Sequence, residues 1–342
     1  MYHPKATILA HSISSITGKQ IVTLEVEFWR GVLAEFNTHN ALSKNTSSSR
    51  AIPVPTMLKQ VREAPGGPSR FGAANTGMQD KGEHSALVNI LGTYRADWMP
   101  DTDVTPHDAW MMAADDAAHW AEAFHEAGYA KQVCNRLIEA YQTVKMVVTA
   151  TDLENFFWLR DHYMADPSID ALAKEMKKVY LDSDPVELNP GEWHTPYYGD
   201  GFWKKDGFQS AGCEVARDRH KVTLEDALAI SASCCAQASY RKMDDTLEKA
   251  KGVVSRLNLG VDLTEPCHAS PTEHQGTPIA ATVAWDSDKP WSDASNEPMF
   301  PDTWQDGITH MMRDGTFGSG NLKGFVQYRQ LIPGNVYTGE IK

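Results

Sequence analysis

A regular alternation of apolar and polar residues marks the segment IVTLEVEF, residues 21–28. Val22, Leu24, Val26 and Phe28 occupy every second position, and threonine or glutamate lies between them. Because successive side chains of a strand point to opposite faces, this alternation predicts a half-buried β-strand. The mainly apolar run PIAATVAW, residues 278–285, predicts a second strand.

From residue 105 the apolar positions recur every three or four residues, which is the period of a helix. The first helix is expected to begin at Thr105, with Pro106 in its first turn, and to end at Gly128. Helices are expected to dominate up to about residue 182. The further helical runs are 130–148, 152–164 with Asp152 as N-cap, 166–181 with Asp166 as N-cap, and one that begins at a Thr223–Asp226 capping box.

Two stretches interrupt this pattern. Residues 60–104 and 185–220 are rich in Gly, Pro and aromatic residues, which predicts long irregular excursions. No charge block, low-complexity tract or obvious linker divides the chain. We therefore expect one α/β (α+β) domain over residues 1–342, with a mixed sheet and long helices.

Composition narrows the class of protein. With 32 basic and 45 acidic residues, the net charge of −13 opposes broad binding to nucleic acid. Neither a long apolar stretch nor a signal-peptide pattern is present, so no membrane partner and a cytoplasmic location are expected. Five cysteines without C-x-x-C spacing, and no H-E-x-x-H, indicate neither a disulfide framework nor a metal site.

The polar segment EFNTHNALSKNTSSSRAIP, residues 35–53, follows the first predicted strand directly and ends in prolines. Ser48 and Arg50 offer a hydroxyl and a guanidinium fork in a serine-rich turn with available backbone N–H groups. Such a set of donors is suited to a phosphate group. The alternative is a solvated serine loop. Neither common glycine-rich nucleotide-binding motif occurs, so a dinucleotide would have to bind in another way.

Segments far apart in the chain resemble one family. HASPTEHQ at 268–275 resembles the H-x-[ST]-P-x-E-H element of flavin-dependent thymidylate synthases. THNALSKNTSSSR at 38–50 resembles that family's R-H-R-x-x-S-x-N-x-x-S-x-R signature, with matches at His39, Ser43, Asn45, Ser48 and Arg50.

Two weaker matches accompany them. Residues 149–169 resemble the family's helix that carries an Asn and an Arg, here Asn155 and Arg160, and CCAQASYR at 234–241 resembles the A-R-V-S-[YF] element with Ser239. The order is unusual, since two of these elements follow the signature by some 200 residues, as in a circular permutation. Phage-type relatives share this layout, including GEWHTPY at 191–197 and GFVQYRQLIPGN at 324–335.

The resemblance implies a fold like that of these synthases, and an enzyme that moves a one-carbon unit from methylenetetrahydrofolate to carbon 5 of a pyrimidine deoxynucleotide, most simply dUMP to dTMP. FAD would be the cofactor, with NADPH as reductant. It also implies a homo-oligomer, a tetramer with active sites shared between subunits, in the cytoplasm of a bacterium or of a phage-infected host.

The resemblance also assigns roles to residues. Arg160 and Ser48 are expected to be catalytic, with Arg160 stabilising the negative charge that the pyrimidine acquires. Alternatively, Arg160 is a surface residue paired with Asp161 or Glu154, and Glu273 forms a structural ion pair with His274. The nucleotide set is Glu35, Ser48, Ser49, Arg50, Arg136 and Arg160; the cofactor and folate set is Thr38, His39, Asn40, Asn45, Asn155, Ser239, His268, Ser270 and Glu273.

Departures from the family pattern leave other functions open. Thr38 and Asn40 stand where the family has two arginines, Met164 replaces a histidine, and Lys44 could compensate in part. Glu35 stands where the family has Gln and could favour cytosine, whose amino group donates to carboxylates. The alternatives are a flavin-dependent hydroxymethylation of dUMP or dCMP, and a non-catalytic nucleotide-binding paralogue.

Overall fold

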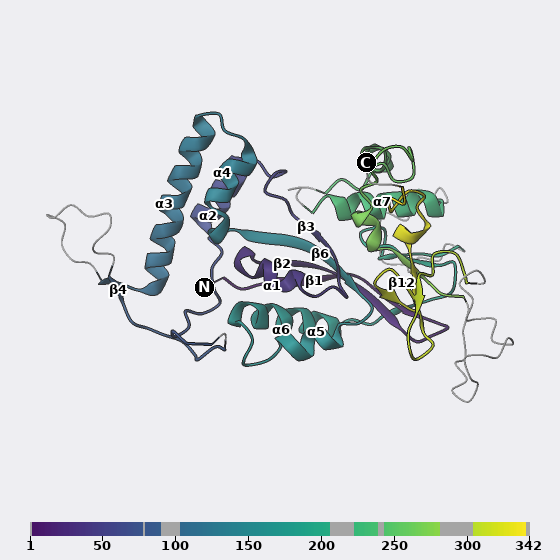
Figure 1. The fold of residues 1–342 in the computed structure, drawn as a ribbon, viewed down its shortest axis with the longest axis horizontal. Helices are drawn as coiled ribbons and strands as arrows, with labels where there is room; N and C mark the ends of the chain where they lie inside the picture. The colour runs from purple at the N-terminus through teal and green to yellow at the C-terminus, as the bar shows by residue number, and fades with distance from the viewer. Residues whose placement is uncertain are drawn as a thin grey trace.

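A mixed five-stranded sheet organises the protein, which confirms the predicted α/β class (Figure 1). The computed structural model describes residues 2–77, 79–89, 103–205, 222–238, 243–280 and 304–339. The strand order is β3-β6-β2-β1-β7, and all neighbours are antiparallel except β1 and β7. The strands are β1 (Lys5–Ser14), β2 (Gln20–Trp29), β3 (Ser43–Thr46), β6 (Thr143–Ala150) and β7 (Val186–Leu188).

One face of this sheet carries the largest hydrophobic core. Val22, Leu24, Val26 and Phe28 of β2 are buried there, as the alternation predicts. Three helices cover this face: α1 (Leu33–Asn37), α5 (Glu154–Arg160) and α6 (Pro167–Leu181), and Figure 1 shows α5 and α6 beneath the sheet. Asp166 caps α6 as expected, because its carboxylate accepts from the backbone N–H groups of Ser168 and Ile169.

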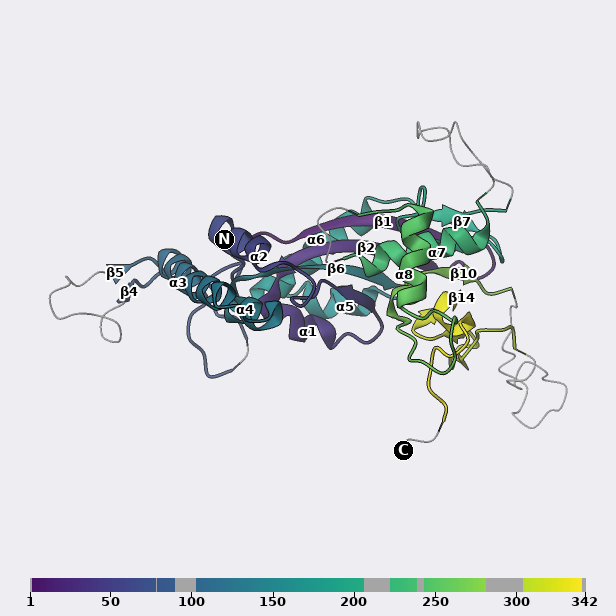
Figure 2. The same ribbon diagram turned by 90° about the horizontal axis from the view of Figure 1, so that it is seen from above.

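A helical unit with its own core lies at one end of the sheet (Figures 1 and 2). It consists of α2 (Val54–Glu63), α3 (Pro106–Glu126) and α4 (Lys131–Leu137). Thr105 caps α3 and Gly128 follows it with φ +84°, so both predicted ends are confirmed. In the part of the chain that the structure describes, no helix has the length and apolarity needed to cross a membrane.

The other end of the sheet is covered on its opposite face by segments from the second half of the chain (Figure 1). Thr223 caps α7 (Leu224–Ala236) as predicted, and α8 (Leu247–Arg256) packs beside it. The short 3₁₀ helix η4 (Ser270–Glu273) follows. Two small sheets complete this region: β8 (Trp193–His194), β9 (Phe202–Trp203), β10 (Gly276–Pro278) and β14 (Phe325–Gln327) in one, and β11 (His310–Met311), β12 (Phe317–Ser319) and β13 (Leu322–Lys323) in the other.

The helix predicted over residues 130–148 is wrong beyond residue 142, where β6 begins. Two short helical pieces, α4 and η2 (Glu139–Tyr141), precede it. Val144, Met146 and Val148 of β6 face the main core, while Val147 and Thr149 are buried on the opposite face. Burial on both faces removes the alternation, and a continuous apolar run does not distinguish a strand from a helix.

Smaller predictions also need correction. Asp152 does not cap α5; Leu153 occupies the N-cap position, and Asp152 instead pairs with Lys323. Of the strand predicted over residues 278–285, only Pro278 lies in a strand, at the end of β10. Residues 279–280 are irregular, and residues 281–285 lie outside the described part. Strand β1 was not predicted.

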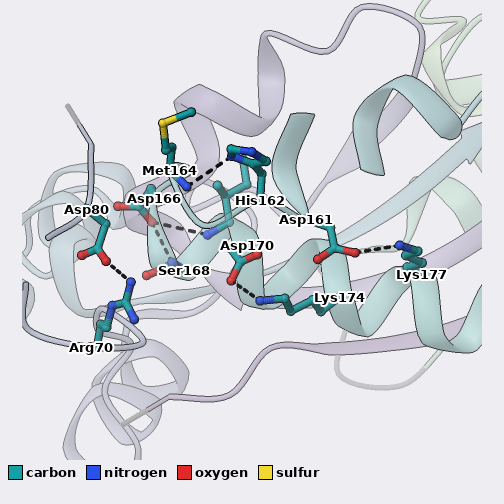
Figure 3. A network of polar contacts seen from close by, with 11 residues as sticks. Arg70, Asp80, Asp161, His162, Met164, Asp166, Ser168, Asp170, Lys174 and Lys177 are labelled. Atoms are coloured by element: carbon teal, nitrogen blue, oxygen red, sulfur yellow. Dashed lines mark hydrogen bonds and ion pairs between the residues drawn. The ribbon is translucent and has the colours of Figure 1, made fainter. Parts of the chain in front are cut away.

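The two predicted excursions are mostly irregular where they are described. Within 60–104, α2 continues to Glu63, and only β4 (Val88–Asn89) and β5 (Asp103–Val104) are regular. This excursion is tied to the N-terminus of α6, since Ser69 N–H donates to Ser168 Oγ over 3.0 Å, and Arg70 pairs with Asp80 within it (Figure 3). The second excursion contains β7, β8 and β9, and residues 206–221 lie outside the described part.

Replacement of Phe36 by Ala should lower the free energy of unfolding by about 3–5 kcal/mol, because the ring is fully buried between Phe28 and Phe156. Urea unfolding followed by circular dichroism measures this. Leu181→Ala, at an exposed position on α6, is the matched control and should change the value by less than about 0.5 kcal/mol. Equal effects of both substitutions would contradict the assigned core.

Candidate active site

The segment that resembles the family signature is divided by strand β3, at the edge of the main sheet. Residues 38–42 form the turn before the strand, and residues 47–52 form the turn after it. Strand β3 pairs with β6, with Ser43 opposite Thr149 and Thr46 opposite Met146. Because a strand rises about 3.3 Å per residue, the two turns lie at opposite ends of an element about 10 Å long.

Arg160 lies at the first of these turns. Its Nε donates to His39 Nε2 over 2.8 Å, and the His39 ring packs edge-on against Phe156 at 4.9 Å between centroids. Burial, with the positive charges of Arg160 and Lys44, lowers the pKa of His39 to about 4. The ring is therefore neutral at neutral pH and can accept from the guanidinium.

The alternative role for Arg160, as a surface partner of a neighbouring carboxylate, is not what the structure shows. Asp161 pairs with Lys177 at 2.8 Å (Figure 3). Among the described residues, no ion pair joins Arg160 to Asp161 or Glu154. The predicted catalytic arginine is thus held by a signature residue, His39, rather than by an acid of its own helix.

Lys44 supports the same turn from within. Its Nζ donates to the backbone carbonyls of His39 over 2.8 Å and of Asn37 over 3.1 Å. Burial lowers the pKa of Lys44, and the nearby Glu273 carboxylate opposes this effect. Lys44 therefore places a positive charge at the turn, where Thr38 and Asn40 supply none. Its two hydrogen bonds to backbone carbonyls also stabilise the conformation of the turn.

The second motif, residues 268–275, meets β3 through helix η4. Glu273 pairs with Arg329, and its carbonyl accepts from Gln327 Nε2 over 3.1 Å. Gln327 Nε2 also contacts Asn321 Oδ1 at 2.8 Å, and Asn321 accepts from Ser43 Oγ over 2.9 Å. The ion pair proposed as an alternative between Glu273 and His274 is absent, because Glu273 pairs with Arg329.

Arg329, Gln327 and Asn321 were missed by sequence reasoning. The first two lie in GFVQYRQLIPGN, which was noted as a shared segment without a role. Nothing local marks them, since Glu273, the partner of Arg329 and Gln327, and Ser43, the partner of Asn321, lie more than 50 residues away.

A buried chain of hydrogen bonds fixes His274 to the main sheet. His274 Nδ1 lies 2.8 Å from Thr149 Oγ1, which lies 2.6 Å from Thr23 Oγ1. Thr23 Oγ1 lies 2.8 Å from His194 Nε2, and His194 Nδ1 lies 2.9 Å from Ser12 Oγ. Burial lowers the pKa of both histidines to about 3, so both rings are neutral. Four strands and the segment between η4 and β10 are thus joined without a charge.

The second turn, residues 47–52, is held by α4. Asn135 is fully buried and donates to the carbonyls of Ser49 over 2.8 Å and Ile52 over 3.0 Å. Within the turn, Arg50 N–H donates to Ser48 Oγ over 3.2 Å. Ser48 and Arg50 are exposed, and Arg136, the next residue after Asn135, is exposed on α4. Sequence-predicted nucleotide residues therefore gather at this turn.

The remaining predicted site residues lie around the two turns, residues 38–42 and residues 47–52. Glu35 is exposed in α1, and its carbonyl accepts from Thr38 Oγ1 over 2.7 Å. Asn45 Nδ2 donates to Cys235 O over 3.3 Å, which places the end of α7, where the predicted 234–241 element begins, beside β3. The exposed residues are Asn40, Asn155, His268 and Ser270, and Ser239 lies outside the described residues.

A polar cleft of about 530 Å³ lies apart from both turns, beside the start of α5. Its charged lining consists of Lys19, Asp152, Glu154 and Lys323. Of the predicted site residues only Asn155 is adjacent to it in the chain. No cluster of three or more His, Cys, Asp or Glu side chains suited to a metal ion occurs in the described ranges.

The similarity of this chain to known proteins is structural and distant. No protein-family model and no curated protein matches the sequence. Two solved structures of thymidylate synthase X from Helicobacter pylori, both with FAD and dUMP, are similar at a TM-score of 0.29. One is 17% identical over 47% of this chain and 67% of that chain; the other is 18% identical over 49% and 73%. A TM-score this low establishes neither fold nor function.

Acid should destabilise the protein through the two buried histidines. The pKa of each is about 3 in the folded chain against 6.5 when exposed, so between these values each of the two binds one more proton in the unfolded chain than in the folded chain. The free energy of unfolding should therefore fall as the pH is lowered from 6.5, by about 4 kcal/mol at about pH 5. Urea unfolding at a series of pH values measures this slope.

His274→Gln should remove about one proton from that slope, since glutamine does not titrate. His268→Gln is the matched control, because His268 is exposed in the same motif and its removal should leave the slope unchanged. An unchanged slope in His274→Gln would show that His274 is not buried in a neutral state.

Proposed function

We propose that the protein is a flavin-dependent enzyme that transfers a one-carbon unit from methylenetetrahydrofolate to carbon 5 of a pyrimidine deoxynucleoside monophosphate, with dUMP to dTMP as the leading reaction. The observation that carries this proposal is the meeting of segments 38–50 and 268–275 at one strand, with Arg160 bonded to His39. Since these segments are over 200 residues apart, no local effect explains their meeting.

Arg160 would stabilise the negative charge that develops on the pyrimidine. The guanidinium is aimed before any ligand binds, because one nitrogen is committed to the neutral His39 ring and the ring is fixed against Phe156. A preorganised positive charge of this kind lowers the barrier without further reorganisation. No cysteine is needed as a nucleophile, and burial raises the pKa of the Cys234 thiol to about 12 and that of Cys235 as well.

The nucleotide phosphate would bind at the turn of Ser48, Ser49 and Arg50, with Arg136 beside it. The turn is rigid because Asn135 holds two of its carbonyls, so its N–H groups and hydroxyls have fixed directions. A guanidinium, hydroxyls and backbone donors together form strong charge-assisted bonds to a phosphate.

The residues present fit a flavin. Ser270 is the first residue of η4 and His268 precedes it; both are exposed, and the structure records no hydrogen bond for either side chain among the residues it describes. Thr38, Asn40, Asn45 and Asn155 add hydroxyl and amide groups suited to a polar ring edge. Bound FAD, reduced by NADPH, would supply the hydride that completes a methyl group; the chain itself supplies orientation and fixed charge.

We propose that the active site is completed in a homo-oligomer, as a tetramer. The Arg160–His39 pair and the turn of Ser48 lie at opposite ends of β3, and each has exposed apolar side chains nearby. Trp158, Leu159, Tyr163 and Met164 lie around Arg160, while Val133 and Leu137 flank Arg136 on α4. Such surfaces mark sites of association. Because the site draws on residues from 38 to 329, we also propose that 1–342 acts as a single catalytic domain.

Replacement of Arg160 by Ala should lower kcat for dUMP by about 10²–10³, since a charge aimed at the transition state is lost. Turnover with FAD, NADPH and methylenetetrahydrofolate is followed by mass spectrometry of the nucleotide. Arg256→Ala, an exposed arginine on α8, is the matched control and should leave kcat unchanged. Unchanged turnover in Arg160→Ala would refute its role.

The mass of the product separates the remaining functions. A gain of one CH₂ group identifies methylation. A further oxygen identifies hydroxymethylation, and conversion of dCMP rather than dUMP identifies cytosine as the base. Absence of any product from a protein that binds dUMP would identify a non-catalytic nucleotide-binding paralogue.

A further inference from the structure

A polar cluster lies on the face of the main sheet opposite the large core. It consists of Glu25 on β2, Lys145 on β6 and Tyr197 in the loop between β8 and β9. Lys145 Nζ lies 2.7 Å from Glu25 Oε1, and the Tyr197 hydroxyl donates to Glu25 Oε2 over 2.7 Å. The Lys145 side chain is 39% exposed and the Glu25 side chain 23%, so a ligand can reach this pair.

Tyr197 belongs to GEWHTPY, the segment whose role the proposed function leaves unexplained. Its φ of +67° lies in the left-handed region, where the backbone of a bulky residue is strained. The loop is held in place by bonds from Thr195 N–H to Gly201 O over 2.8 Å and from Ser231 Oγ to Pro196 O over 2.7 Å. The strained backbone directs the hydroxyl onto Glu25.

Tyr197 remains a donor at any physiological pH. Burial and the Glu25 carboxylate both raise the pKa of its hydroxyl. Glu25 Oε2 therefore accepts from the fixed Tyr197 hydroxyl, and the other carboxylate oxygen, Oε1, pairs with the Lys145 ammonium. Among the described residues Lys145 has one acid partner, Glu25, in a partly exposed pair of the kind that contributes little to stability.

Lys145 lies directly beside the proposed phosphate site. Ser47 N–H donates to Lys145 O over 2.8 Å, and Lys145 N–H donates to Ser47 Oγ over 3.1 Å. Ser47 immediately precedes Ser48 of the turn. The residue opposite the start of the turn on the neighbouring strand is thus a lysine whose side chain is partly exposed on the face opposite the main core.

We infer that Lys145 is a further phosphate-binding residue of the nucleotide site, and that Glu25 and Tyr197 are its positioning residues. This rests on the proposed function, and it names the phosphomonoester group of the substrate as the ligand. A phosphate dianion at Ser48 and Arg50 gains a second cation from Lys145, whose ammonium has three donors and shares them between Glu25 and the phosphate.

The test compares the affinities of dUMP and deoxyuridine, which differ only in the phosphate, for the full-length protein loaded with FAD. Isothermal titration calorimetry measures both. Lys145→Met should weaken dUMP binding about tenfold and leave deoxyuridine binding unchanged, since a charged hydrogen bond is lost. Lys145→Arg should retain most of the affinity for dUMP.

Tyr197→Phe removes only the hydroxyl and tests positioning. It should weaken dUMP binding by a smaller factor, about threefold, again without effect on deoxyuridine. Lys174→Met is the matched control, because Lys174 forms a comparable exposed pair with Asp170 on α6, on the other face of the sheet (Figure 3), and it should bind both ligands as the unmodified protein does.

Two results would overturn the inference, and they are distinguishable. If Arg50→Ala abolishes the preference for dUMP over deoxyuridine while Lys145→Met does not reduce it, Lys145 only forms a structural ion pair and the proposed function stands. If the unmodified protein shows no preference for dUMP, the phosphate site itself is wrong and the proposed function fails with it. Circular dichroism confirms that each variant is folded.

Discussion

The arrangement of the site depends on one buried line of neutral hydrogen bonds. Thr23 and Thr149 face each other across β2 and β6, and each also bonds to a histidine from a distant segment. A buried polar group without a partner costs about 1–3 kcal/mol, so these four groups strongly disfavour any other register between the sheet and the segments that carry His194 and His274. The line therefore fixes where the second half of the chain docks.

The geometry of the proposed active site follows from this docking. With His274 bonded to the centre of the sheet, the preceding residue, Glu273, falls beside β3, where Arg329 pairs with it and Gln327 holds its carbonyl. Strand β3 separates the turn at residues 38–42, which contacts Arg160, from the turn at residues 47–52, which contains Ser48. Thr38 and Asn40, which replace two arginines of the resembled signature, are compatible with this geometry. The neutral His39 ring orients Arg160, and Lys44 stabilises the turn that lacks the two arginines.

Local signals in the sequence were sufficient for elements whose two faces differ or whose ends are capped. Strand β2 alternates, Thr105 and Asp166 cap their helices, and all three were predicted. Strand β6 was not, since it is buried on both faces. The partners of the site residues, Arg329 for Glu273 and Asn135 for the Ser48 turn, were also missed, because long-range pairing leaves no periodic trace in a single sequence.

The visible absorption spectrum of the purified protein, taken after addition of FAD and removal of the unbound cofactor on a desalting column, tests the central claim most directly. The account predicts that flavin absorption is retained in stoichiometric amount and that its bands shift when dUMP is added, because both ligands share the site at β3. A colourless protein after desalting would contradict the account and would leave the Ser48 turn as a phosphate-binding element without a flavin.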